Sequence, residues 1–120
     1  PNTSVRYALT KSEVQAMKTS SCLWNGTIGS DNYYSIMRWN GYRTKDISNS
    51  LYKGGFSKIG NMLILIREEI VNKPFKMYQL PYKLNYDPRD ALSSQGFSKI
   101  YDCGSVSGFV NAEEKYHDYT

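Results

Sequence analysis

The residues best suited to bind a ligand are concentrated in segment 24–42, where aromatic and polar side chains are interleaved. Aromatic rings stack on the apolar faces of sugars, and Asn, Asp and Arg side chains hydrogen-bond sugar hydroxyls. The same mixture is typical of hot spots in protein interfaces. We therefore expect binding of a saccharide or a protein, and the candidate ligand-binding residues are Asp31, Asn32, Tyr33, Tyr34, Arg38 and Tyr42.

The same segment also has a purely structural interpretation. Trp24 and Trp39 can be core residues, and for Trp39 we favour that interpretation because it ends a predicted strand. Asp31 and Asn32 fall in a turn-like cluster, where such side chains hydrogen-bond the local backbone. The 11 tyrosines fit either view, because tyrosine is favoured both at recognition surfaces and in strands.

Catalysis is the weaker hypothesis. The one histidine, His117, lies in a polar tail, so a nucleophile activated by histidine is not expected. Asp87 and Asp90 are neighbours in a predicted loop, whereas glycosidase carboxylates face each other across a cleft. We predict a protein that is not an enzyme and that has no cofactor and no metal site.

The charge pattern bears on the partners. The net charge is +4, but Lys and Arg are spread among Asp and Glu, so no nucleic-acid partner is expected. The longest apolar run, residues 62–66, is far too short to cross a bilayer, so no membrane insertion is expected.

Cys22 and Cys103 lie near opposite ends of the chain. A disulfide between them and two free buried thiols are both compatible with the sequence.

The elements that must position these residues begin with one helix. Thr10 and Glu13 have the spacing of a capping box, which predicts a short helix over residues 11–18, ended by the run 19–21. Two Asn-Gly dipeptides, at 25–26 and 40–41, predict tight turns between short strands.

Strands are expected over much of the remaining chain. Residues 33–39 are rich in strand-forming residues, and residues 75–80 alternate between apolar and polar. The apolar run in 61–68 does not alternate, which predicts a strand buried on both faces. Two further strands are expected at 97–103 and 105–110, and segment 82–95 is expected to be a long loop.

One pentapeptide, Gly-Phe-Ser-Lys-Ile, occurs at 55–59 and again at 96–100. Both copies follow a turn-like polar stretch, which predicts one turn-to-strand device used twice. Many short strands between Gly, Pro and Asn turns are typical of a sandwich or barrel. We predict a mainly β fold, an antiparallel jelly-roll-like β-sandwich with one short N-terminal helix. Its parts would be a lead-in and helix (1–21), the sandwich (22–111) and a polar tail (112–120).

Four motifs, in order along the chain, resemble those of receptor-binding modules in bacteriophage tail fibres. Residues 22–27 contain the "LWxG" opening, 56–62 a "kiGNxV"-like strand entry, 80–82 an "LP-x-y" segment, and 100–106 a closing hairpin. The resemblance implies a β-sandwich in the virion tail, a homotrimer, that adheres to a host-surface saccharide or protein. These motifs are turns and strands, so they assign no ligand-binding residue, and the two cysteines depart from the family's usual pattern.

Two alternatives come from other classes. A Cys22–Cys103 disulfide would suit a glycan-binding B subunit of a secreted bacterial toxin. A small basic secreted toxin of ribonuclease type is compatible with the charge, but no motif supports it.

Overall fold

The structure is a computed structural model that describes residues 8–37, 39, 41–77 and 80–111 of the 120-residue chain. The helices in these ranges are α1 (Lys11–Leu23), α2 (Asn32–Ser35), α3 (Ser48–Lys53), α4 (Glu68–Asn72) and α5 (Pro88–Ser94). The strands are β1 (Ile28–Ser30), β2 (Thr44–Asp46), β3 (Leu63–Arg67), β4 (Phe75–Met77), β5 (Leu80–Tyr82), β6 (Phe97–Asp102) and β7 (Val106–Asn111).

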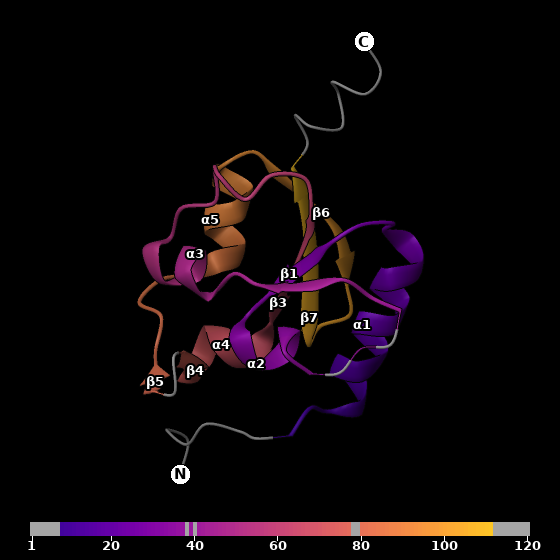
Figure 1. Ribbon diagram of the computed structural model, residues 1–120. Helices are drawn as coiled ribbons and strands as arrows, with labels where there is room; N and C mark the ends of the chain where they lie inside the picture. The colour runs from indigo at the N-terminus through magenta and orange to yellow at the C-terminus, as the bar shows by residue number, and fades with distance from the viewer. Residues whose placement is uncertain (1–7, 38, 40, 78–79, 112–120) are drawn as a thin grey trace.

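Five strands form one mixed sheet in the order β2-β1-β3-β7-β6 (Figure 1). β1 is parallel to both β2 and β3, whereas β7 is antiparallel to β3 and β6. Parallel neighbours need crossover connections, and the chain between these strands contains α2 and α3. The fold is therefore mixed α/β, and the predicted antiparallel β-sandwich with one helix is wrong.

The central strand β3 explains the layering. Leu63 and Leu65 pack in one apolar cluster with Ala16 and Met17 of α1. Ile64 and Ile66 point to the other face, where the second cluster includes residues of α3 and α5. Figure 1 shows α1 on one side of the sheet and α3 and α5 on the other. The predicted strand and its burial on both faces are confirmed, but helices cover the faces because an apolar run does not specify what packs on it.

The N-terminal helix confirms the capping box. The Thr10 hydroxyl accepts from the Glu13 N–H at 3.1 Å, and the Glu13 carboxylate accepts from the Thr10 N–H at 2.9 Å. The helix continues beyond the predicted end to Leu23, because Ser20 lies on its buried face and tertiary packing offsets the low helix propensity of serine.

The remaining helices were missed because each has seven residues or fewer, too few to show a 3.6-residue period. The predicted strand at 33–39 begins within α2, and the predicted loop 82–95 contains α5. Asp87 caps α5 and Pro88 occupies its first turn, a pattern that marks a helix start. The predicted strand 75–80 is divided between β4 and β5, which pair antiparallel, and its residues 78 and 79 lie outside the described residues. The predicted strands at 97–103 and 105–110 are confirmed as β6 and β7.

The two copies of the repeated pentapeptide have different structures but lie side by side. The first copy is a turn, and the second begins with Gly96 at φ 92° and continues as β6. The Phe56 and Phe97 rings pack edge to face, with centroids 6.4 Å apart. Gln95, just before the second copy, accepts from the Phe56 N–H and donates to the Gly54 carbonyl, both at 2.9 Å. The first copy is thus a turn that reaches β3 only after three further residues, whereas the second runs directly into β6.

This packing predicts an energetic coupling between the two copies. A double-mutant cycle of Phe56→Leu and Phe97→Leu should give an interaction energy of about 0.5–1.5 kcal/mol, because edge-to-face rings gain beyond their buried area. Urea unfolding of the wild type, both single variants and the double variant measures it. Pairing Phe56→Leu with Val106→Ala, which lies in the other apolar cluster, should be additive within about 0.5 kcal/mol. Additivity in both cycles would contradict the prediction.

Candidate functional site

The carboxyl ends of the three parallel strands meet at one edge of the sheet, where α/β proteins commonly bind ligands. Here that edge holds a buried ion pair. The Arg67 guanidinium, at the end of β3, donates from Nε to Asp31 Oδ1 at 3.0 Å and from Nη2 to Asp31 Oδ2 at 2.6 Å. Asp31 follows β1 directly, and both residues are 2% exposed or less. A two-pronged contact of this kind is the strongest geometry for an arginine–carboxylate pair.

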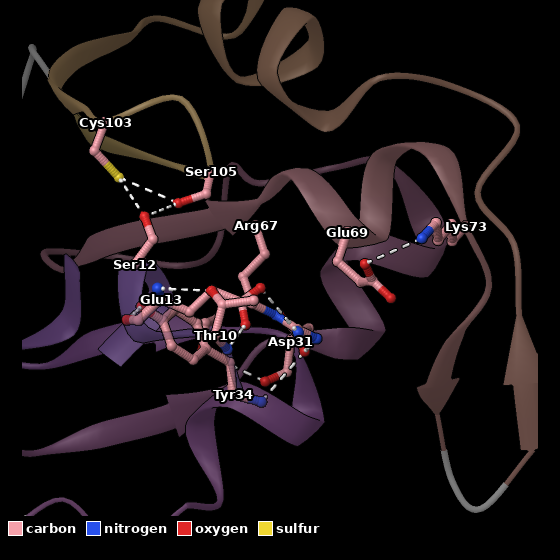
Figure 2. A network of polar contacts seen from close by, with 11 residues as sticks. Thr10, Ser12, Glu13, Asp31, Tyr34, Arg67, Glu69, Lys73, Cys103 and Ser105 are labelled. Atoms are coloured by element: carbon pink, nitrogen blue, oxygen red, sulfur yellow. Dashed lines mark hydrogen bonds and ion pairs between the residues drawn. The ribbon is translucent and has the colours of Figure 1, made fainter. Parts of the chain in front are cut away.

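Glu13 of α1 completes this arrangement (Figure 2). Its Oε2 lies 3.4 Å from Arg67 Nη1, while its Oε1 accepts the capping-box hydrogen bond from the Thr10 N–H. The Tyr34 hydroxyl donates to the Glu13 carbonyl, and the Arg67 guanidinium carbon lies 5.6 Å from the Tyr34 ring centroid. Burial, and next the nearby Glu13 carboxylate, raise the pKa of Tyr34 above its usual range. We call Glu13, Asp31, Tyr34 and Arg67 the carboxyl-edge network.

A second set of polar contacts continues along the same edge. The Asn32 side chain donates to Asp46 at the end of β2 at 2.9 Å, and Asp46 accepts from the Ser48 N–H at 2.8 Å. The Ser48 hydroxyl in turn accepts from the Asn32 N–H. These groups satisfy one another, so they hold α2 and α3 to the strand ends.

The structure therefore separates the six candidate residues of the sequence analysis. Asp31 and Tyr34 are buried in the carboxyl-edge network, and Asn32 is bonded to Asp46. Tyr33 and Tyr42 are half-buried and line two different cavities. Arg38 lies outside the described residues.

The cavity that Tyr33 lines is a largely apolar groove of about 670 Å³ between α1 and α2. Its exposed large apolar side chains are Ile36 and Met37, at 62% and 37%. The other described lining residues are Ala8, Leu9, Val14 and Trp39.

A cavity of about 260 Å³ lies beside the carboxyl-edge network and is lined by Glu13, Glu68 and Glu69, among others. Each of these carboxylates already has a cation. Glu68 pairs with Arg89 at 2.6 Å, Glu69 lies 3.9 Å from Lys73, and Glu13 contacts Arg67. The cavity is thus part of an internally neutralised surface.

The third cavity, of about 250 Å³, lies at the opposite edge of the sheet and is lined by Tyr42. We call it the amino-edge cavity, because it adjoins the amino ends of β1 and β2 and the C-terminal end of α1. Its described lining residues are Ser21, Trp24, Asn25, Gly26, Ile28, Gly41, Tyr42 and Arg43.

Both aromatic rings of the amino-edge cavity are held in place. The Trp24 indole N–H donates to the Thr27 carbonyl at 3.1 Å. The Tyr42 ring stacks on Trp39 with centroids 6.1 Å apart and an interplanar angle of 20°. By contrast, within the described part of the chain the exposed side chains of Asn25 and Arg43 make no hydrogen bond or ion pair. Of the three cavities, this one combines fixed rings with polar groups that the fold leaves free.

The sequence analysis did not select Asn25 and Arg43. Asn25 was interpreted only as half of an Asn-Gly turn, and Arg43 lies one position beyond the candidate segment 24–42. Asn25 and Arg43 are each next to an aromatic residue of the candidate segment, Trp24 and Tyr42, and this adjacency was the signal that could have identified them. Trp24 and Tyr42 themselves are 18 positions apart in the sequence. Only the pairing of β1 with β2 brings them to one place.

The two cysteines are free and exposed, so the disulfide considered from the sequence is not formed and neither thiol is buried. The Cys103 thiol lies 3.4 Å from the Ser105 hydroxyl and 3.8 Å from that of Ser12 (Figure 2). Partial burial by itself raises the pKa of this thiol, but hydrogen bonds from Ser105, Tyr101 and Ser12 outweigh it and lower the pKa to about 7. Hydroxyl groups can donate to a thiolate, yet they are poor general bases at neutral pH.

Among the described residues, no group of three or more His, Cys, Asp or Glu side chains is placed to hold a metal ion. No helix in this part of the chain is long and apolar enough to cross a bilayer. Comparison with protein-family models, with curated proteins and with solved structures gave no match. The resemblance to tail-fibre modules therefore stays a prediction, and the β-sandwich that it implied is wrong.

The buried ion pair predicts a large difference between two arginines. Arg67→Met leaves the Asp31 and Glu13 carboxylates buried without their cation, so the free energy of unfolding should fall by about 3–5 kcal/mol. Arg89→Met removes two ion pairs whose side chains are about a third exposed, and it should cost about 1 kcal/mol or less. Urea unfolding monitored by circular dichroism compares them. Similar losses in both variants would show that the carboxyl-edge network is not the main electrostatic support of the fold.

The lowered thiol pKa predicts the reactivity of Cys103. In a Cys22→Ser background, the rate of alkylation by iodoacetamide should increase with pH, because the thiolate is the nucleophile, and the midpoint of this increase should lie near pH 7. Ser105→Ala removes a donor to the thiolate and should move the midpoint upward. Ser98→Ala, at an exposed position of β6, should leave it unchanged. A midpoint near the ordinary thiol value of about 8.5 in the Cys22→Ser protein with Ser105 intact would contradict the prediction.

Proposed function

We propose that this chain is a non-enzymatic binding domain that recognises a saccharide on a cell-surface receptor through the amino-edge cavity. The observation that carries the proposal is the combination of the fixed rings of Trp24 and Tyr42 with two polar side chains. Those of Asn25 and Arg43 make no hydrogen bond or ion pair within the described part of the chain. The accessible lining of the cavity is mainly polar, so the amide and guanidinium groups, which can hydrogen-bond hydroxyls, supply most of the contact, and the rings add a smaller apolar part at low entropic cost.

The size and order of the cavity support this ligand class. A volume of about 250 Å³ is slightly below the range of about 300–1,000 Å³ that is typical of drug-sized ligands, which suits one sugar ring better than an extended ligand. The hydrogen bond of Trp24 and the stacking of Tyr42 limit the side-chain freedom that a ligand would otherwise have to remove. Such preorganisation favours binding.

The biological setting remains part of the proposal. We retain the host-surface receptor, the location on a virion tail and the homotrimer as predictions from the resemblance. The toxin B subunit shares the saccharide ligand, but the disulfide that favoured it is not formed. The ribonuclease alternative gains no observation here.

A glycan array tests the proposed function directly. The wild-type chain should bind a defined subset of saccharides, and Tyr42→Ala should weaken that binding at least tenfold, a loss of about 1.4 kcal/mol typical of a central aromatic contact. Tyr52→Ala is the matched control, because Tyr52 is a half-exposed tyrosine of α3 that does not line the cavity. Equal binding by both variants would move the site elsewhere, and no saccharide binding at all would reject the function.

The structure also changes which alanine substitutions are informative. Asp31→Ala would remove a buried partner of Arg67 and destabilise the fold, so a loss of binding in that variant would not report on the site. Asn25→Ala removes a free, exposed amide and should weaken saccharide binding with no change in the melting temperature.

A further inference from the structure

The amino-edge cavity has a strongly one-sided charge. Among its described lining residues Arg43 is the one charged side chain, and no carboxylate lines the cavity. An arginine carries five N–H donors in a planar fork that matches a carboxylate. The charge of this site therefore complements an anion.

Other arginines of the described chain show what Arg43 lacks. Arg67 is shared by Asp31 and Glu13, and Arg89 by Asp87 and Glu68. Both have carboxylate partners within the fold, whereas the exposed Arg43 guanidinium has no hydrogen bond or ion pair in the part of the chain described. Asp46, three positions after Arg43 in the sequence, accepts hydrogen bonds from Asn32 and Ser48 and does not pair with Arg43.

We propose that the amino-edge cavity selects acidic saccharides, with Arg43 pairing to the ligand's carboxylate beside a sugar ring packed on Trp24 and Tyr42. This inference rests on the proposed function and names the ligand class of the same site. Arg43 acts as the specificity determinant, and the aromatic rings supply contact area that neutral and acidic sugars share.

A nucleic-acid ligand fits these observations less well. A nucleic-acid strand presents a phosphate at every nucleotide, so its binding sites use a line of cations. Among its described lining residues the amino-edge cavity has one cation, Arg43, which matches one carboxylate on one sugar. Asn25 adds an amide that can both donate to and accept from hydroxyl groups.

The experiment compares each acidic glycan with its neutral parent. On an array of such pairs, the wild-type chain should prefer the acidic members, and titration calorimetry with 3′-sialyllactose and lactose should quantify the preference. We expect at least tenfold tighter binding to the acidic glycan, within the gain of a charge-assisted hydrogen bond of about 1.5–3 kcal/mol. Arg43→Gln should bring the acidic glycan down to the affinity of its neutral parent and leave the neutral glycan unchanged.

A matched variant separates local from global charge. Lys45→Gln removes the same charge two positions away, at an exposed residue of β2 that does not line the cavity, and should retain the acidic preference. Arg43→Lys keeps the charge without the planar fork and should give an intermediate preference. All three variants should melt within a few degrees of the wild type, because both positions are exposed.

The outcomes distinguish this inference from the proposed function. Equal binding of acidic and neutral glycans, sensitive to Tyr42→Ala but not to Arg43→Gln, would overturn the inference and keep the function. An equal loss in Arg43→Gln and Lys45→Gln would also overturn it, since net charge and not the site would then set the preference. Binding of a single-stranded RNA oligonucleotide without saccharide binding would overturn both.

Discussion

The fold depends on the satisfaction of one buried cation. Arg67 ends the central strand almost fully buried, so the desolvation of its charge must be offset within the protein. Asp31 and Glu13 do this from two other elements, the end of β1 and the first turn of α1. One guanidinium thereby fixes how α1 lies on the sheet. Since Trp24 caps the far end of α1, the amino-edge cavity depends on that same orientation.

This constraint also explains where a ligand can bind. In a parallel arrangement the carboxyl edge is the usual ligand site, but here its polar side chains are bonded to one another. A ligand at that edge would have to displace internal ion pairs. At the amino edge, Asn25 and Arg43 have no such contacts among the described residues, so a ligand gains their hydrogen bonds without breaking others. We therefore place the site where polar side chains have no hydrogen-bond or ion-pair partner among the described residues.

The repeated pentapeptide shows how far local sequence can mislead. Identical residues form a turn at 55–59 and the start of β6 at 96–100. The second copy pairs with β7, whereas the first has no strand partner in the described sheet and contributes Phe56 to the core. Strand structure needs a hydrogen-bonding partner, and a short motif does not contain one. The two copies do share one structural feature, because the phenylalanine of each is buried in the same apolar cluster.

By itself the sequence determined the features whose partners are close along the chain. These are the capping box of Thr10 and Glu13, the apolar strand at 63–67 and the final hairpin around Gly104. Tertiary structure alone decided the parallel pairing of the three-residue strands β1 and β2, the helical cover of both faces and the meeting of Arg67 with Asp31. It also brought Trp24, Tyr42 and Arg43 together. The physical reason is that capping and periodicity act within a few residues, whereas pairing of short strands and neutralisation of a buried charge join positions far apart in the chain, and no local pattern records them.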